Sequence, residues 1–262
     1  MDPVAARDVS TPKETPAAVA DLRRRLVEAS QRVLREHGPA ELTVRRVAEA
    51  AGSSTMGIYT HFGGRGGMLE AVYLDGFEQL RAALTHAAGD HRDDGTTPAD
   101  LTPAEPTTAS DPARRASAAD PVRRPSASGP VRRTSATDPA RRITALALAY
   151  RGFALRNPPL YALMFERPIP DFDPPPELRL RAIGMTFPFL VTEIENAVTH
   201  GTLRTPDPRR TGYLLWTAIH GMVSIELTHT TRGSLPGWLL GAPEAGEHLF
   251  TDGLSLLLSG LR

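Results

Sequence analysis

Apolar residues recur with helical spacing along most of the chain. The first such run places apolar residues at i, i+4, i+7 and i+11, with arginines on the other faces: Leu22, Leu26, Ala29 and Val33. Gly38-Pro39 then supplies a helix-ending glycine followed by a proline. No segment alternates apolar and polar residues for the length of a strand. The pattern therefore predicts an all-α fold.

Two short helices and one long helix are predicted next. The Thr43 hydroxyl can cap the second helix, Gly52 favours a turn, and a third helix covers about residues 54–61. Gly63-Gly64 interrupts the chain before a fourth helix over about residues 68–87. That helix carries one apolar stripe: Leu69, Val72, Tyr73, Gly76, Phe77, Leu80 and Leu84.

The composition changes between about residues 89 and 137, where large apolar residues almost vanish. A nine-residue repeat of the form Asp/Gly-Pro-Ala/Val-Arg-Arg begins at residues 111, 120, 129 and 138. The arginine pairs could contact DNA as a flexible arm, but the acidic residues near them favour a solvated, disordered insert without a function. An apolar run follows the last copy, so Asp138 can cap a new helix whose first residue is Pro139.

The C-terminal half returns to helical spacing. One helix is predicted to end before Asn157-Pro158-Pro159, and a short apolar piece and a loop with five prolines over 168–176 follow. A single long helix, ended by Gly201, is expected from these apolar positions: Ile183, Phe187, Leu190, Val191, Ile194 and Val198. Two further helices complete the chain, one from near Pro208 and one after the Gly/Pro-rich residues 233–243.

Composition sets the broad class. The chain has 262 residues, of which 40% are hydrophobic, so it can bury a large core. It holds no cysteine, which excludes disulfides, thiolate zinc sites and a cysteine nucleophile. We find no secretory h-region and no apolar run of membrane-spanning length, and we therefore expect a cytoplasmic protein without membrane contact. The formal net charge is zero, and residues 21–70 hold eight arginines against six acidic residues, so any DNA contact must depend on local placement.

Residues 43–62 are the most informative segment. Two short helices flank a tight turn at Gly52, which is the helix-turn-helix pattern. Thr43 stands at a helix N-terminus, where its hydroxyl and free N–H groups can meet a phosphate. Arg45 and Arg46 can contact the DNA backbone or form only a solvated face. The second helix of the pair would present short donors, a glycine and one aromatic ring to DNA: Ser53, Ser54, Thr55, Gly57, Tyr59, Thr60 and His61.

The stretch from Leu42 to Leu69 resembles the DNA-binding domain of TetR-family regulators. It keeps the family pattern L-T-x-x-x-[IV]-A-x-x-A-G-[VS], and then Y-x-x-F followed by a basic residue and a leucine. Several spaced positions match in one order, which is more specific than a lone short motif. The resemblance implies a recognition helix over Ser54–His61, which includes Met56, with Tyr59 and His61 near phosphates.

The match to the family extends over about residues 22–72. Arg65 stands where the family usually has lysine, and its planar fork can still hold a phosphate. Gly66-Gly67 departs from the polar or acidic residues usual there, which weakens the expected start of the fourth helix. The resemblance implies a DNA-binding domain over residues 17–66 and a linking helix over 67–88 that acts as the lever between the two units.

The second half resembles the ligand and dimer domain of a TetR subgroup with a Trp…His-Gly signature. The signature residues here are Trp216 and His220-Gly221, and the segment 157–165 fits the subgroup too. The resemblance implies a helical ligand-binding and dimerisation domain over residues 138–262. Six side chains are candidates for lining an apolar pocket, although such positions equally suit a plain core: Tyr161, Met164, Phe165, Phe187, Trp216 and His220.

These features together predict a ligand-responsive, DNA-binding transcription regulator. In the simplest case it is a repressor that a small apolar or amphipathic molecule releases from a palindromic, double-stranded operator. Two copies would pair through about residues 209–230 and 244–260, as in the family, and a tail over residues 1–16 would be disordered. The alternative is a DNA-binding regulator without a small-molecule effector.

No catalytic, metal or cofactor site is predicted. His220, Glu226 and His229 invite interpretation as metal ligands, but their spacing does not place two ligands at i, i+4. Hydrogen-bonded core or pocket groups are therefore favoured at these positions. An enzyme in the helical body would need converging acid–base groups, and the sequence offers no paired set at a useful spacing.

Overall fold

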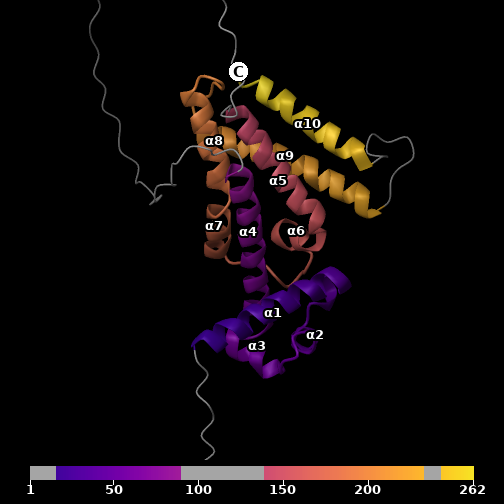
Figure 1. Cartoon of the computed structure of the whole chain (residues 1–262). Helices are drawn as coiled ribbons and strands as arrows, with labels where there is room; N and C mark the ends of the chain where they lie inside the picture. The colour runs from indigo at the N-terminus through magenta and orange to yellow at the C-terminus, as the bar shows by residue number, and fades with distance from the viewer. Residues whose placement is uncertain (1–15, 90–138, 233–242) are drawn as a thin grey trace, which may run out of the picture.

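The computed structural model describes residues 16–89, 139–232 and 243–262. Every element in these three ranges is a helix, as the sequence predicts (Figure 1). Most of the predicted tail, most of the predicted insert, Asp138 and most of the Gly/Pro-rich segment lie outside the described residues. Pro16 and Gly89, which the predicted boundaries assigned to the tail and the insert, belong to helices.

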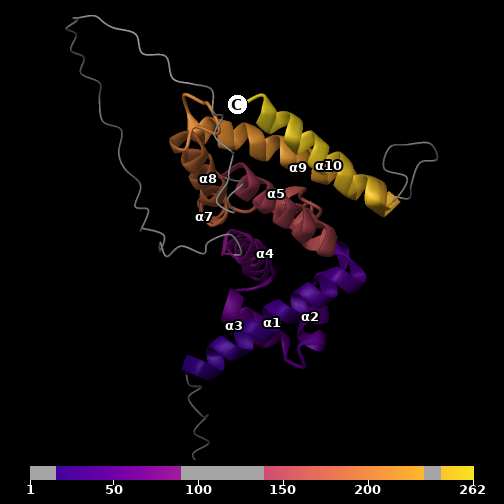
Figure 2. The same cartoon turned by 45° about the horizontal axis from the view of Figure 1, so that its top comes forward.

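The N-terminal helices form a small head at one end of the molecule, coloured indigo in Figures 1 and 2. Its elements are α1 (Pro16–His37), the 3-10 helix η1 (Pro39–Glu41), α2 (Val44–Ala50) and α3 (Thr55–Phe62). Leu26, Val47 and Ile58, one from each α-helix, are completely buried. Burying one apolar side chain from each helix fixes the three against one another.

Helix α4 (Arg65–Gly89) connects the head to the body (Figure 1). It packs against α1 and α3 at one end and against α5 at the other, and its 25 residues span roughly 37 Å. The helix begins at Arg65, three residues before the predicted start at Met68, and its first turn includes Gly66 and Gly67. A Cβ atom at Gly67 would lie 2.0 Å from the Phe62 carbonyl oxygen, so the close approach of α3 requires a glycine here.

The body contains α5 (Pro139–Arg156), α6 (Pro158–Phe165), α7 (Pro176–Gly184), α8 (Phe187–Thr199), α9 (Pro208–Arg232) and α10 (Pro243–Ser259). Helix α5 packs against α4, α6, α8, α9 and α10, and α10 lies along α9 (Figure 2). None of the described helices has the length and hydropathy needed to cross a membrane.

The single long helix predicted over residues 183–198 is wrong. The structure divides it into α7 and α8, which are separated by Met185 and Thr186. Pro188 lies in the first turn of α8. A proline has no amide hydrogen to donate to the carbonyl four residues back, so the helix cannot continue through it. The apolar periodicity hid this proline, because the helical spacing holds on both sides of the break.

Two ion pairs with little exposure connect α5 to its neighbours. The Arg151 guanidinium donates to both carboxylate oxygens of Glu226 on α9, at 2.8 and 2.7 Å. The Arg142 Nε donates to Glu193 on α8 at 2.7 Å. Because these charges have left water, each pair stabilises the fold only while both partners are present.

Candidate nucleic-acid interface and ligand cavity

Side-chain caps and two left-handed glycines set the geometry of α2 and α3. The Thr43 hydroxyl accepts a hydrogen bond from the Arg46 amide at 3.3 Å, and the Ser54 hydroxyl accepts one from the Gly57 amide at 3.4 Å. Gly52, in the turn between the helices, has φ +61°, and Gly63, after α3, has φ +72°. Other residues rarely adopt such values, so these glycines allow α3 to lie across α2.

One face of α3 is open to solvent. Met56 is 69% exposed and Tyr59 is 56% exposed, while Ile58 between them is buried. The other predicted contact residues of this region are exposed or half-buried: Thr43, Arg45, Ser53, Ser54, Thr55, Gly57, Thr60 and His61. The structure therefore leaves all of these predicted residues at least partly accessible to solvent, with Thr43 and Ser54 capping the N-termini of the two helices.

Two of the predicted contact residues have roles inside the protein. A Cβ atom at Gly57 would lie 2.8 Å from the Ser53 hydroxyl oxygen, and this hydroxyl would have to rotate away to admit it. The Tyr59 ring lies against Gly64, whose φ is +126°. A side chain at position 64 would meet this ring, while Tyr59 itself stays largely exposed.

Arg65, the predicted phosphate-binding cation, forms hydrogen bonds within the protein in this structure. Its Nε donates to the Leu42 carbonyl oxygen at 3.2 Å, and its Nη1 donates to the Asp171 carboxylate at 2.6 Å. Asp171 belongs to the proline-rich loop between α6 and α7, so this ion pair joins the first residue of α4 to the body. The sequence analysis missed Asp171, because no local pattern relates two residues that lie 106 positions apart.

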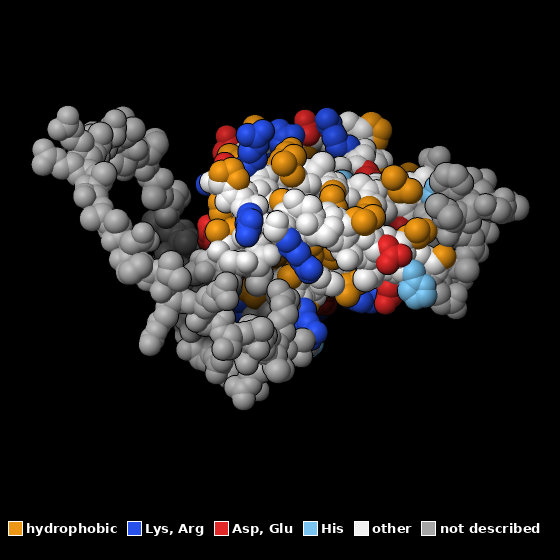
Figure 3. Space-filling model, turned by 90° about the horizontal axis from the view of Figure 1, so that it is seen from above, with side chains coloured by type: hydrophobic (Ala, Val, Ile, Leu, Met, Phe, Trp, Pro, Cys, Tyr) orange, Lys and Arg blue, Asp and Glu red, His pale blue; other side chains and the backbone are white. Residues whose placement is uncertain are grey.

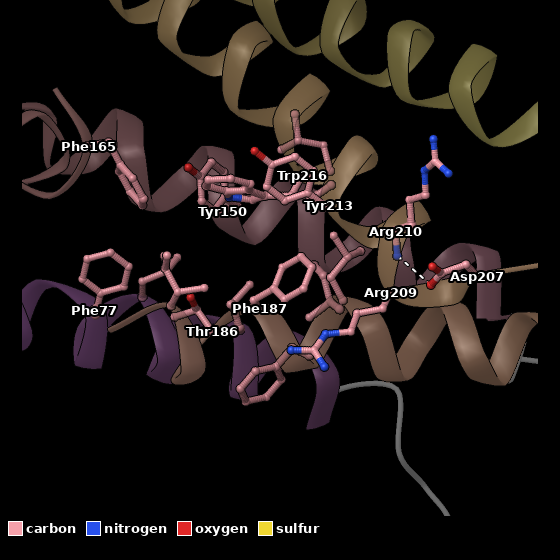
Figure 4. A pocket seen from close by; sticks show the side chains of 18 residues that line it. Phe77, Tyr150, Phe165, Thr186, Phe187, Asp207, Arg209, Arg210, Tyr213 and Trp216 are labelled. Carbon is pink, nitrogen blue, oxygen red and sulfur yellow. Dashed lines mark hydrogen bonds between the residues drawn. The ribbon is translucent and has the colours of Figure 1, made fainter. Parts of the chain in front are cut away.

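A cavity of about 520 Å³ lies between α4, α5, α8 and α9 (Figure 4). Its closed end is apolar and includes the buried side chains of Phe77, Leu84 and Leu146. Its mouth is lined by exposed residues, among them Arg209 and Tyr213 at the start of α9. An apolar interior with a few polar groups at one side is typical of a small-molecule site.

The structure divides the six predicted pocket residues into two groups. Phe165, Phe187 and Trp216 line the cavity. Tyr161, Met164 and His220 do not line it and lie in the packing behind it. Met164 packs against Gly76 of α4, where a Cβ atom would lie 2.8 Å from the Met164 sulfur.

His220 joins the cavity wall to α6 through two tyrosines. The Tyr161 and Tyr150 hydroxyls lie 2.7 and 2.9 Å from the His220 Nδ1 atom, and the Tyr150 hydroxyl donates to Tyr161 at 3.3 Å. Burial lowers the pKa of the His220 imidazole, and the charge of Glu166 opposes this shift. Burial also raises the pKa of both tyrosines, so the whole group is uncharged at neutral pH.

Two family models match the chain. The model for bacterial regulatory proteins of the tetR family matches residues 26–72, and the model for the tetracyclin repressor-like C-terminal domain matches residues 143–237. The chain belongs to the TetR family. It is therefore a transcriptional regulator with a helix-turn-helix DNA-binding domain. The first family model covers this domain, and α2 and α3 are its two helices.

Solved structures share the TetR fold over nearly the whole chain. A protein with unknown function from Rhodococcus sp. RHA1 is 21% identical with a TM-score of 0.62, and the alignment covers 95% of this chain and 99% of that one. The TetR-family transcriptional regulator PfmR from Thermus thermophilus is 18% identical, with a TM-score of 0.53 and coverage of 91% and 99%. RolR in complex with resorcinol is 12% identical, with a TM-score of 0.55 and coverage of 94% and 90%. No functionally curated protein matches the chain.

The TetR match extends over both units, while the Trp…His-Gly subgroup stays a prediction. The signature residues Trp216 and His220 contact one another, with ring centroids 5.6 Å apart. The described residues contain no group of three His, Cys, Asp or Glu side chains arranged for a metal, and Glu226 pairs with Arg151.

Proposed function

We propose that this TetR-family regulator is a homodimeric, cytoplasmic repressor that a small apolar or amphipathic molecule releases from a palindromic operator. The exposed face of α3 would enter the major groove, with Tyr59, His61 and the N-terminus of α2 at phosphates. The two heads of a dimer would meet half-sites roughly 34–36 Å apart if these lie one helical turn apart.

The observation that carries the effector proposal is the position of α4. The helix begins against the recognition helix and ends as a wall of the cavity, to which it contributes Phe77, Leu80 and Leu84. A molecule that fills the cavity must contact this wall. A ligand that prefers one orientation of α4 therefore shifts the population of head positions, by at most its preference for that state. RolR, a protein with the same fold, is described in complex with resorcinol, which supports a small-molecule effector.

The outer face of α9 and α10 supports dimerisation. Figure 3 views the molecule from the side of these two helices. Five large apolar side chains along them are exposed: Leu214, Ile225, Leu249, Leu256 and Leu257. A monomer rarely leaves such a series of large apolar side chains in water. Two copies related by a two-fold axis would bury this face as a four-helix interface over about residues 209–230 and 244–260.

Binding to the DNA upstream of the protein's own gene, measured by fluorescence anisotropy across a salt series, tests the DNA-binding part. We expect specific binding that weakens steeply with salt and that is lost in Tyr59→Ala. Leu180→Ala is the control, because it removes an exposed side chain, 72% exposed, from α7 in the body, outside the cavity lining and the proposed dimer interface. Equal binding by Tyr59→Ala and the wild-type protein would contradict the assignment of α3.

A regulator without a small-molecule effector is the second candidate. It retains the cavity as an unfilled space in the core. A library of small apolar and amphipathic compounds, screened for release of bound operator, separates the two candidates. If no compound releases the DNA or raises the melting temperature of the protein, the result supports a regulator without a small-molecule effector.

A further inference from the structure

The cavity is polarised from one end to the other. Its closed end is formed by α4 and α5, whose contributing side chains Phe77, Leu80 and Leu146 are nearly inaccessible to solvent. Its mouth lies at the start of α9, where Asp207, Arg209, Arg210 and Tyr213 line it. A ligand that matches both ends needs an apolar tail and a polar head.

The two arginines at the mouth differ in direction. Figure 4 shows the Arg209 side chain reaching back toward Phe187, whereas Arg210 turns the other way, with its guanidinium far from Phe187 and Tyr150. No ion pair holds Arg209 within the described part of the chain. Among these residues its guanidinium therefore has no ion-pair partner, and it lies beside the opening of an apolar cavity.

Asp207, the acidic residue of the mouth, has a structural role. Its carboxylate accepts a hydrogen bond from the Arg210 amide at 2.9 Å, which caps the first turn of α9. Figure 4 places it on the side of the arginines away from Phe187. With the Asp207 carboxylate used in this cap and the Arg210 guanidinium turned away, the charge that faces the opening is the positive charge of Arg209. The positive end of the α9 dipole adds to it.

We propose that the cavity binds an amphiphile with a carboxylate head, whose tail fills the closed end and whose head is held by Arg209 at the mouth. The planar guanidinium matches a carboxylate with two parallel hydrogen bonds. This inference rests on the proposed role of the cavity as the effector site. It adds the charge of the effector and the residue that reads that charge.

Three probes with one tail and different heads test the proposal: decanoate, decanol and decylammonium. Binding is followed by the fluorescence of Trp216 in the cavity wall, in a Trp238→Phe background that removes the other tryptophan of the chain. We expect decanoate to bind most tightly and decylammonium most weakly. Arg209→Gln should weaken decanoate roughly five- to tenfold and leave decanol unchanged.

Arg210→Gln is the matched control, because it removes the same charge from the adjacent position. It should change decanoate binding less than twofold. Equal effects of the two substitutions, or equal binding of decanoate and decanol, would overturn the role of Arg209 while leaving the cavity as an effector site. Thr186 is a half-buried residue of the cavity wall. Thr186→Phe would fill part of the cavity and should weaken the binding of decanoate and of decanol alike. If none of the probes binds while operator binding is intact, both the carboxylate class and the cavity's effector role fail.

Discussion

Two adjacent glycines at the start of α4, Gly66 and Gly67, differ in what the fold requires of them. They look equivalent in the sequence, where the pair suggests a weak start for the long helix. In the structure a Cβ atom at Gly66 meets nothing within 4 Å, whereas one at Gly67 would lie 2.0 Å from the Phe62 carbonyl oxygen. One glycine is therefore required by packing, and the other contributes only flexibility.

Gly66→Ala should stabilise the protein by about 0.5–1 kcal/mol, because alanine loses less backbone entropy in a helix. Gly67→Ala should destabilise it by more than that gain, since the α3–α4 turn must open to admit the methyl group. Urea unfolding of both variants measures the difference. The same sign for the two substitutions would contradict the described start of α4.

His220 should make stability depend on pH. Its pKa in the folded state lies below the ordinary value of 6.5, so the unfolded chain takes up a proton first as the pH falls. The stabilisation from the neutral imidazole is complete above about pH 6.5 and declines below it. His220→Gln should therefore flatten the curve of unfolding free energy against pH between about 7 and 5.

The wild-type protein, unfolded over the same pH range, is the reference for this measurement. An unchanged slope in His220→Gln would show that the imidazole is not held neutral by the fold.

At the scale of elements, the sequence predicted the features that depend on neighbouring residues and missed those that depend on distant ones. The cap at Thr43 and the turn at Gly52 were read from neighbouring residues, and α2 and α3 lie where those signals put them. The division between α7 and α8 was missed because apolar spacing outweighed Pro188. The ion pair between Arg151 and Glu226 joins residues 75 positions apart, which no local pattern connects.

Glu226→Ala should cost about 3 kcal/mol of stability, because it leaves the Arg151 guanidinium, only 9% exposed, without its bidentate partner. Glu247 contacts the same guanidinium at 3.2 Å and offsets part of the loss. Chemical denaturation measures the effect.

Glu78→Ala serves as the comparison for Glu226→Ala. It removes the partner of Arg81 in a solvent-exposed pair on α4 and should cost less than about 1 kcal/mol. Replacing both Arg151 and Glu226 by apolar residues should cost less than Glu226→Ala alone. If the two substitutions cost similar amounts of stability, the pair between Arg151 and Glu226 contributes no more to stability than a surface ion pair.

For the whole molecule, the family and the two-unit architecture could be predicted from the sequence, but the relation between the units could not. The cavity needs Phe77 and Trp216 together, and these belong to helices on either side of the undescribed residues 90–138. Arg65 was interpreted as a phosphate contact, yet it also pairs with Asp171 of the body. Such contacts follow from the packing of distant helices, which periodicity does not encode.

Asp171→Asn should raise operator affinity about two- to fivefold, because it frees Arg65 for a phosphate. The salt dependence of binding should steepen by about one counterion. Asp173→Asn is the matched control in the same loop, where Asp173 pairs with Arg167 and Arg179 instead. If both variants bind alike, the pair between Arg65 and Asp171 does not compete with DNA.

The connection between α4 and α5 has a practical consequence. Helix α4 leads away from the head for roughly 37 Å, so its C-terminus at Gly89 and the start of α5 at Pro139 lie at the far end of the molecule from α3 (Figure 1). A fluorescent domain fused between these two residues would sit beside one wall of the cavity and clear of the DNA. A reporter inserted there would test whether a molecule that enters the cavity, the proposed effector site, produces an optical signal.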